Sequence, residues 1–198
     1  MPTKEKDKKI LQNKITGVFI WDFKKGDNII YNFEILKALF EAKKNYKNDG
    51  LLYNKPITII IISIIECILD DFVNRVKGRS QDSLPNITRD VIDDFKYKKK
   101  GQSLEVKKLE KFTHYIDIVK KHNIFGENDN FYKSLSLLRD VRNKVHIQDS
   151  KENESKFFTE RNLKLSEKAL ERIIKYMVEM YPRWGKNENA LDIPYPWM

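Results

Sequence analysis

The chain has 198 residues, a formal net charge of +9 and one cysteine, Cys67, so it cannot form an intrachain disulfide. Hydrophobic residues make up 40% of the chain and aromatic residues 12%, which excludes global disorder and predicts one domain with a substantial core. The positive charge fits a polyanionic partner such as nucleic acid, and a lysine-coated surface without such a partner is the alternative of equal weight.

The N-terminal stretch MPTKEKDKK is charged, and no signal-peptide core follows it. The most apolar run, residues 57 to 69, includes Glu66 and is shorter than the roughly 20 apolar residues that a membrane helix needs. The sequence therefore predicts a cytoplasmic protein that does not enter a membrane.

Residues 1 to 54 are expected to form an N-terminal extension. Within it, the β-prone runs ITGVFIWDF and IIYNF flank the break KKGDN and predict a small β-hairpin over residues 15 to 33. The alternative is an irregular arm that lies on the rest of the fold. Residues 32 to 47 carry apolar side chains at helical spacing and predict a helix.

Residues 55 to 78 form the longest hydrophobic segment, with Pro56 in its first turn and Gly78 at its end. Isoleucine favours strands, but the length and the continuing apolar pattern predict a helix at the centre of the fold. A long connection follows over residues 79 to 103, with a short helix near Ile87 to Phe95. Its run KYKKK is interpreted as a solvated loop, with an electrostatic arm for a polyanion as the alternative.

Further amphipathic helices are predicted over residues 103 to 126, with Ser103 as N-cap, over residues 130 to 148 and over residues 162 to 184. Together these elements predict an all-α fold, an antiparallel bundle of four main helices that spans residues 55 to 183. Residues 184 to 198 are expected to be an extended C-terminal tail, held to the body or to a partner by its aromatic residues Trp184, Tyr195 and Trp197.

The stretch LRDVRNKVHI, residues 138 to 147, concentrates polar side chains in the expected third helix of the bundle. At 100° per residue, Arg139 and His146 project within about 20° of each other, two turns apart. Arg142 and Asn143 lie between them along the same polar stripe, beside the apolar face of the helix. Such a stripe predicts a site that lines a groove, and an ordinary solvated helix end is the alternative.

These residue types suit metal-free cleavage of RNA. An arginine holds a phosphate through its planar fork and neutralises charge that grows at phosphorus. A histidine takes the proton from a ribose 2′-OH or gives one to the leaving oxygen near neutral pH. An asparagine orients a neighbour without adding charge. We therefore regard Arg139, Arg142, Asn143 and His146 as candidate catalytic residues, and we expect no metal or other cofactor.

The same residues resemble the motif of the HEPN superfamily, whose members are helical bundles. Arg139, followed by Asp140 and separated from His146 by six residues, matches the R-x6-H form of that motif. The resemblance covers residues 55 to 183 as a pattern of elements, with the motif on the third of four helices. Arg142 stands closer to His146 than the family spacing, which leaves open how the two arginines divide the work.

The resemblance implies a metal-independent endoribonuclease that cleaves RNA at a composite site where two copies of the chain meet as a homodimer. Members of the family act in toxin–antitoxin systems, phage defence and RNA processing. The expected function is therefore a toxin or antiviral defence effector, with an antitoxin or another protein as a further partner. The alternative is a non-catalytic helical module that uses the same groove to bind RNA, a nucleotide or a protein.

Other polar residues have simpler interpretations. Glu66 is expected either to pair with an arginine of the motif helix and position it, or to be exposed. His114 and His122 lie about 80° apart on their helix and are interpreted as surface or boundary residues. The aspartates near residue 93 are attributed to a solvated loop, and Cys67 to the core.

Overall fold

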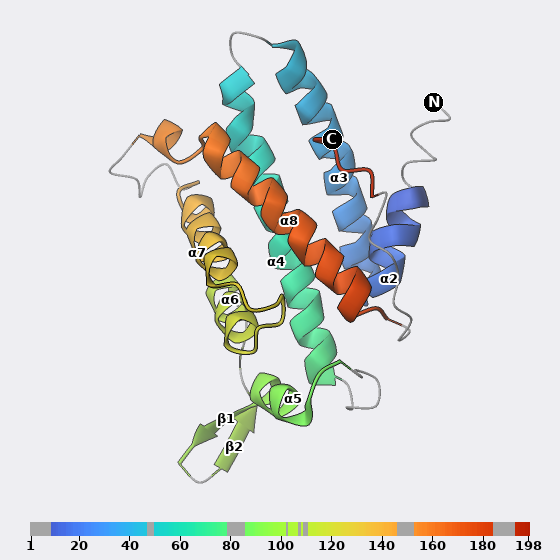
Figure 1. Ribbon diagram of the computed structural model, residues 1–198, viewed down its shortest axis with the longest axis vertical. Coiled ribbons are helices and arrows are strands. Elements are labelled where there is room, and N and C mark those ends of the chain that lie inside the picture. The colour runs from blue at the N-terminus through green and yellow to red at the C-terminus, as the bar shows by residue number, and fades with distance from the viewer. Residues whose placement is uncertain are drawn as a thin grey trace.

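The computed structural model describes residues 9–46, 50–78, 86–101, 103–106, 108, 111–145, 153–183 and 193–198. The chain is mostly helical, which confirms the predicted all-α class (Figure 1). Its helices are α2 (Gly17–Phe19), α3 (Phe23–Asn45), α4 (Asn54–Gly78), α5 (Arg89–Lys96), α6 (Phe112–Lys121), α7 (Asp129–Asn143) and α8 (Glu160–Met180). Short helical segments cover Gln12–Thr16, Gly50–Tyr53 and Glu154–Lys156, and the strands are β1 (Tyr97–Lys100) and β2 (Ser103–Val106).

Helix α4 lies at the centre of the molecule. It packs against α3, α5, α6, α7 and α8, and α8 crosses in front of it in the view of Figure 1. Its isoleucines are buried on most of its circumference, as expected for a helix that is covered on several sides. The predicted central helix over residues 55 to 78 is therefore confirmed. Among the described residues, no helix has the length and apolar character that a membrane crossing requires.

The predicted N-terminal hairpin is wrong, because this region is helical. The carboxylate of Asp22 accepts the backbone N–H groups of Lys24 at 2.9 Å and Lys25 at 3.4 Å, and so caps the start of α3. Gly26, which the sequence suggested as a turn, is buried inside α3. A Cβ at this position would lie 3.4 Å from Cβ of Thr16, so the glycine allows two helical segments to approach closely.

The N-terminal segment belongs to the same core as the bundle. Ile15, Phe19 and Phe33 are each at most 1% exposed and form one hydrophobic cluster with residues of α4 and α8. Buried Asp71 of α4 also holds this segment in place. The described residues between 9 and 46, which belong to the predicted extension, thus share one core with described residues of the bundle.

A second prediction fails between residues 103 and 126. Instead of one long helix with Ser103 as its N-cap, the chain forms a hairpin and then α6, which begins at Phe112. Strand β1 pairs with β2 in antiparallel register, Tyr97 opposite Val106. Gly101 adopts φ +60°, a conformation suited to the tight turn between the strands. The run KYKKK, interpreted as a solvated loop, is therefore largely strand β1, whereas the predicted short helix before it is confirmed as α5.

Helix α7 ends earlier than predicted. The backbone N–H of Lys144 donates to the carbonyl of Val141, and that of Val145 to the carbonyl of Arg142, at 3.1 and 3.2 Å. These bonds, which span three residues, tighten the last turn and end the α-helix at Asn143 instead of residue 148. The predicted last helix is confirmed as α8, with somewhat shifted ends.

The described part of the tail, residues 193 to 198, contains no helix or strand and packs on the body. Ile193 is 4% exposed, and the ring of Trp197 lies 5.8 Å from that of Phe40. The indole N–H of Trp197 donates to Glu171 at 2.5 Å. The tail is thus held by Tyr195 and Trp197 as predicted, whereas Trp184 lies outside the described residues.

Candidate functional site

The candidate site lies at the C-terminal end of α7. The side chain of Asn128 accepts the N–H of Phe131 at 2.9 Å and caps the start of this helix. Leu135, Leu138 and Val141 are at most 1% exposed and face the core. This packing against α4, α6 and α8 fixes the rotation of α7 and therefore the directions of its polar side chains.

Arg139 lies at the boundary of the core, with its side chain 27% exposed. Its Nε and Nη2 atoms donate to Oδ1 of the adjacent Asp140 at 3.0 and 2.8 Å. The two donors converge on one carboxylate oxygen, as they would on one oxygen of a phosphate. The exposed Asp140 therefore occupies the position in which an anionic ligand would meet Arg139.

Arg142 is tied to the central helix. Its Nη2 atom lies 3.2 Å from Oε2 of Glu66, with side-chain exposures of 42% and 25%. The prediction that Glu66 pairs with an arginine of the motif helix is therefore confirmed, and the partner is Arg142. This contact joins the end of α7 to the middle of α4 and restricts the directions that the guanidinium can take.

Three of the four candidate residues are among the described residues. Arg139 and Arg142 lie in the last turns of α7, and Asn143 is its final, exposed residue. Because α7 ends at Asn143, it is shorter than the predicted helix on which Arg139 was aligned with His146, and that alignment stays a prediction. His146 itself lies outside the described residues.

The electrostatic state of the site follows from these contacts. Each arginine faces a carboxylate, Asp140 or Glu66, and none of the four side chains is fully buried. Partly exposed ion pairs of this kind are weak, typically about 0–1 kcal/mol. A phosphate that enters the site can therefore displace Asp140 at low cost.

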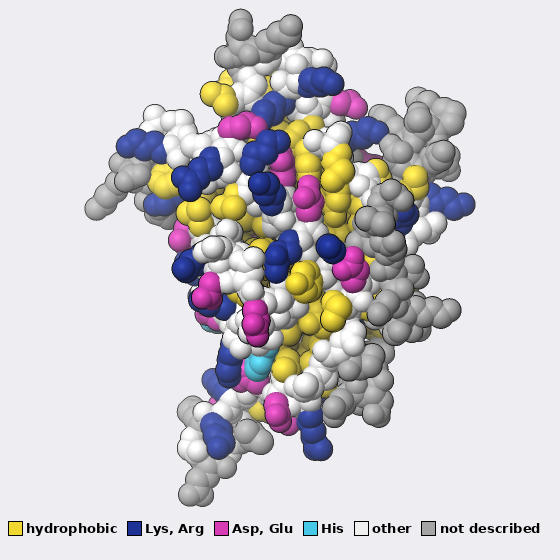
Figure 2. All heavy atoms as spheres, viewed as in Figure 1, with side chains coloured by type: hydrophobic (Ala, Val, Ile, Leu, Met, Phe, Trp, Pro, Cys, Tyr) yellow, Lys and Arg dark blue, Asp and Glu magenta, His cyan; other side chains and the backbone are white. Residues whose placement is uncertain are grey.

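A basic groove between α7 and α8 was missed by the sequence reasoning. It has a volume of about 390 Å³, and its lining residues are Lys133, Ser134, Leu137, Arg161, Lys164, Leu165 and Lys168. Figure 2 shows lysine and arginine side chains gathered over α8 and the neighbouring α7 on the face turned to the viewer. The spacing of Arg161, Lys164 and Lys168 on one face of a helix was a readable signal, but the pairing of α8 with α7 was not.

A larger groove of about 840 Å³ lies between α3, the start of α8 and the tail. Its lining combines lysines and glutamates with the rings of Phe40, Tyr195 and Trp197. Lys43 already binds Glu160 at 2.6 Å across this groove. The mixed charge distinguishes it from the groove between α7 and α8, whose lining contains no acidic residue.

The remaining histidines lie away from the end of α7. Nε2 of His122 is 2.6 Å from Oδ2 of Asp94, and Lys121 contacts the same oxygen at 2.9 Å. This contact joins α6 to α5, and His114 is exposed on α6, so both fit the predicted surface or boundary role. Across the described ranges, no three His, Cys, Asp or Glu side chains converge as metal ligands.

No family model, curated protein sequence or solved structure matches the chain.

Proposed function

We propose that the chain is a metal-independent endoribonuclease of the HEPN type, which cleaves RNA at a composite site in a homodimer. The observation that carries this proposal is the arrangement at the end of α7. Arg139 and Arg142 lie there together, partly exposed, and Glu66 of the central helix holds Arg142 in place. His146 follows within a few residues along the chain.

The proposed reaction needs only groups that the chain supplies. His146 accepts the proton of a ribose 2′-OH as the 2′-oxygen attacks the adjacent phosphorus, and the bond from phosphorus to the 5′-oxygen breaks. A second histidine, that of the partner copy in the dimer, donates a proton to the departing 5′-oxygen. Arg139 neutralises the charge that grows on the phosphoryl oxygens, and Asn143 orients the phosphate.

The division of labour between the arginines follows from their partners. Asp140 is exposed and adjacent to Arg139, so this guanidinium can exchange a carboxylate for a phosphate with little rearrangement. Glu66 is anchored on the central helix, so Arg142 keeps a more fixed position. We therefore assign phosphate contact to Arg139 and positioning of the end of α7 to Arg142.

The cellular setting belongs to the same proposal. A cytoplasmic ribonuclease of this type acts as a toxin or phage-defence effector, and an antitoxin or another protein controls it. A homodimer supplies the second Arg/His set, since one set per chain then serves a two-fold symmetric cleft.

A non-catalytic module that binds RNA, a nucleotide or a protein is the second candidate. One observation favours it: both arginines already face carboxylates, which is an arrangement that a purely structural helix end also shows. In this case the end of α7 would bind an anion without turning it over.

Incubation of the purified protein with RNA in EDTA separates the two candidates. We expect cleavage by the wild type, a loss of at least a hundredfold in His146→Ala and in Arg139→Ala, and little change in the control His114→Ala. RNA binding without cleavage by the wild type would favour the non-catalytic module. Cleavage that survives in His146→Ala would overturn the proposed site.

A further inference from the structure

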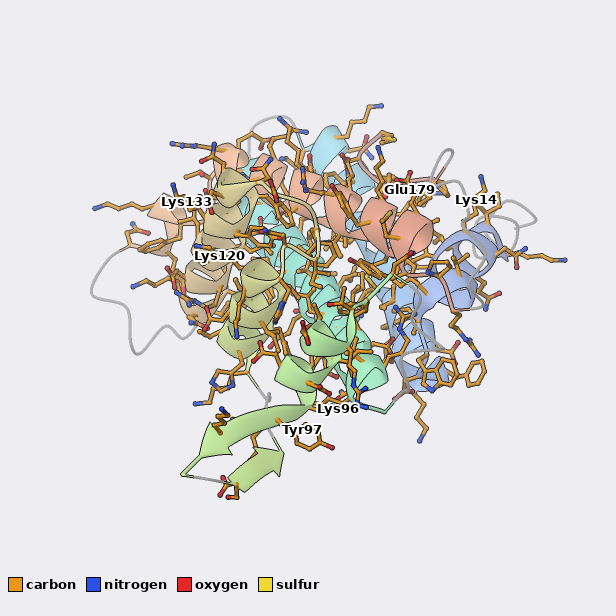
Figure 3. The ribbon with its side chains drawn as sticks, turned by 60° about the horizontal axis from the view of Figure 1, so that its bottom comes forward. Lys14, Lys96, Tyr97, Lys120, Lys133 and Glu179 are labelled. Atoms are coloured by element: carbon orange, nitrogen blue, oxygen red, sulfur yellow. The ribbon has the colours of Figure 1, made fainter. Side chains whose placement is uncertain are left out.

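The hairpin β1–β2 is set apart from the helices. Figure 1 shows it projecting beyond α5 at one end of the molecule, and Figure 3 shows Tyr97 and Lys96 at its base. Within the described part of the chain its two strands pair with each other and with no further strand, Tyr97 opposite Val106 and Lys100 opposite Ser103. We call residues 97 to 106 the β arm.

The β arm is anchored where it leaves α5, but its two strands have little support of their own. Two residues before its first strand, Phe95 is fully buried, and its ring meets that of Phe72 on α4 at 6.0 Å, edge to face. A two-stranded hairpin without a further strand or a helix across its face is marginally stable in water. The arm thus gains most from a ligand that lies along it, while its base holds it at a defined place on the molecule.

The β arm carries more positive than negative charge. Residues 97 to 106 contain three lysines and one glutamate, and three further lysines, at positions 96, 107 and 108, flank the arm in the sequence. Lys98 and Lys99 are exposed on β1, and only Lys98 stands opposite the glutamate, Glu105. Because successive side chains of a strand point to opposite faces, Lys98 lies on the same face as Glu105, and Lys99 lies on the other face, where a polyanion can neutralise it.

An aromatic ring stands beside these cations. Tyr97 is 39% exposed, at the point where the arm leaves α5. Proteins that bind single-stranded nucleic acid combine cations for the phosphates with exposed rings on which bases stack. Tyr97 and Lys99 share one face of β1 and repeat this combination, and Lys98 adds a cation on the other face.

We propose that the β arm docks single-stranded RNA, with its lysines on the phosphates and Tyr97 stacked on a base. The choice of RNA as the polyanion rests on the proposed function. Single strands fit better than duplexes, because the bases of a duplex are already stacked on each other and offer no free face to the Tyr97 ring. The arm thereby holds the substrate at a second point, apart from the end of α7.

The test measures fluorescence anisotropy of a labelled single-stranded RNA in EDTA, in the His146→Ala background so that the probe stays intact. The arm variant is Lys98→Glu with Lys99→Glu. Its control is Lys24→Glu with Lys175→Glu, two exposed helical lysines whose reversal changes the net charge equally. A third variant, Tyr97→Ala, removes the ring without changing charge.

We expect the arm variant to bind at least tenfold more weakly and the control to change less than threefold. Loss of two phosphate contacts also lowers the slope of log K against log salt by about 1.4, because each contact on a single strand contributes about 0.7. Tyr97→Ala should weaken binding about fivefold or more. Equal losses in the arm variant and the control would mean that only net charge matters, and would overturn the proposal.

The second part of the test uses a duplex of the same sequence, which should bind to the protein more weakly than the single strand does. Equal or tighter binding of the duplex would overturn the role of Tyr97.

Replacing the β arm with a short Gly-Ser linker should leave the helical circular dichroism and melting temperature unchanged, so weaker RNA binding cannot be attributed to unfolding. Cleavage that survives in His146→Ala would contradict the proposed catalytic site but not the proposed RNA binding by the β arm. RNA binding that is unchanged in every arm variant would contradict only the proposal for the β arm.

Discussion

Two carboxylates of helix α4, five residues apart, serve different purposes. Asp71 is 2% exposed and accepts the backbone N–H groups of Trp21 at 2.9 Å and Asp22 at 3.0 Å. Glu66 is partly exposed and meets one guanidinium, that of Arg142, at 3.2 Å. A buried acceptor with two backbone donors holds the fold together, whereas a partly exposed ion pair adds little stability. The weaker contact is therefore the one to associate with function.

The surroundings of α4 strengthen this contrast. Burial raises the pKa of Asp71, and the two backbone hydrogen bonds only partly counter it. The preceding residue, Asp70, has the opposite shift: burial would raise its pKa, but hydrogen bonds from Lys25 and Tyr115 bring that pKa below its ordinary value. Neighbouring carboxylates thus have opposite shifts, because one is bound by neutral amides in the interior and the other by a cation near the surface.

The largest expected effect is the loss of Asp71. The substitution Asp71→Ala leaves the N–H groups of Trp21 and Asp22 without their acceptor at the start of α3, and each unsatisfied donor costs about 1–3 kcal/mol. We expect the free energy of unfolding to fall by about 3 kcal/mol, and the melting temperature by roughly 6–12 °C. Urea denaturation measures the change in the free energy of unfolding. A loss below about 1 kcal/mol would show that these hydrogen bonds do not fix the N-terminal segment.

Removal of Glu66 should affect activity more than stability. In Glu66→Ala, unfolding should change by less than about 1 kcal/mol, because the pair with Arg142 is partly exposed. RNA cleavage should fall about tenfold or more, since a small displacement of a positioned group is costly to a reaction. Rescue of the cleavage rate by Glu66→Asp would support positioning. The contrast between Glu66 and Asp71 fails if Glu66→Ala destabilises the protein as much as Asp71→Ala does.

The opposite pKa shifts of Asp70 and Asp71 predict opposite dependences on pH. The folded pKa of Asp70 lies below its ordinary value of 3.8. Its contribution to the free energy of unfolding is therefore fully present above pH 3.8 and is lost as the pH falls through the folded pKa. The folded pKa of Asp71 is raised, so the folded state loses stability as the pH rises from 3.8 through that pKa.

The measurement is the urea midpoint of the wild type, Asp70→Asn and Asp71→Asn across the acid range. The stability that the wild type has over Asp70→Asn should shrink toward low pH, whereas that over Asp71→Asn should grow. If the two stability differences changed with pH in the same direction, burial and charge pairing would not give Asp70 and Asp71 opposite pKa shifts.

The parts of the fold that could be predicted are those in which local pattern and tertiary packing agree. The apolar run of α4 is long enough to exclude a strand, and its position at the centre follows from its lack of a polar face. The pairing of Glu66 with Arg142 was also within reach, because an acid inside an isoleucine-rich helix needs a cation from a neighbouring element.

The failures have a common physical origin in contacts that the sequence does not display. Gly26 looked like a turn residue, but its lack of a Cβ serves the approach of Thr16, which only the tertiary structure reveals. Bonds from Lys144 and Val145 to carbonyls three residues earlier end α7 before His146, and no residue in LRDVRNKVHI signals this end. The place of Arg139 on α7 could therefore be anticipated, but not the end of the helix at Asn143.

The smallest expected effect concerns Cys67, which lies between Glu66 and Asp71 on α4. Burial raises the pKa of its thiol to about 11, Lys25 opposes the shift and Asp71 adds to it. At pH 8 the thiolate fraction is then about a hundredfold smaller than for a thiol at the ordinary pKa of 9.0. Alkylation by iodoacetamide should therefore be slower by about that factor than in the unfolded chain. Asp71→Ala should speed alkylation, because the N-terminal segment that covers this side of α4 loses its anchor, and Glu66→Ala should not. Equal rates in the two variants would show that the buried and the partly exposed carboxylate support the same part of the fold, against the distinction drawn between them.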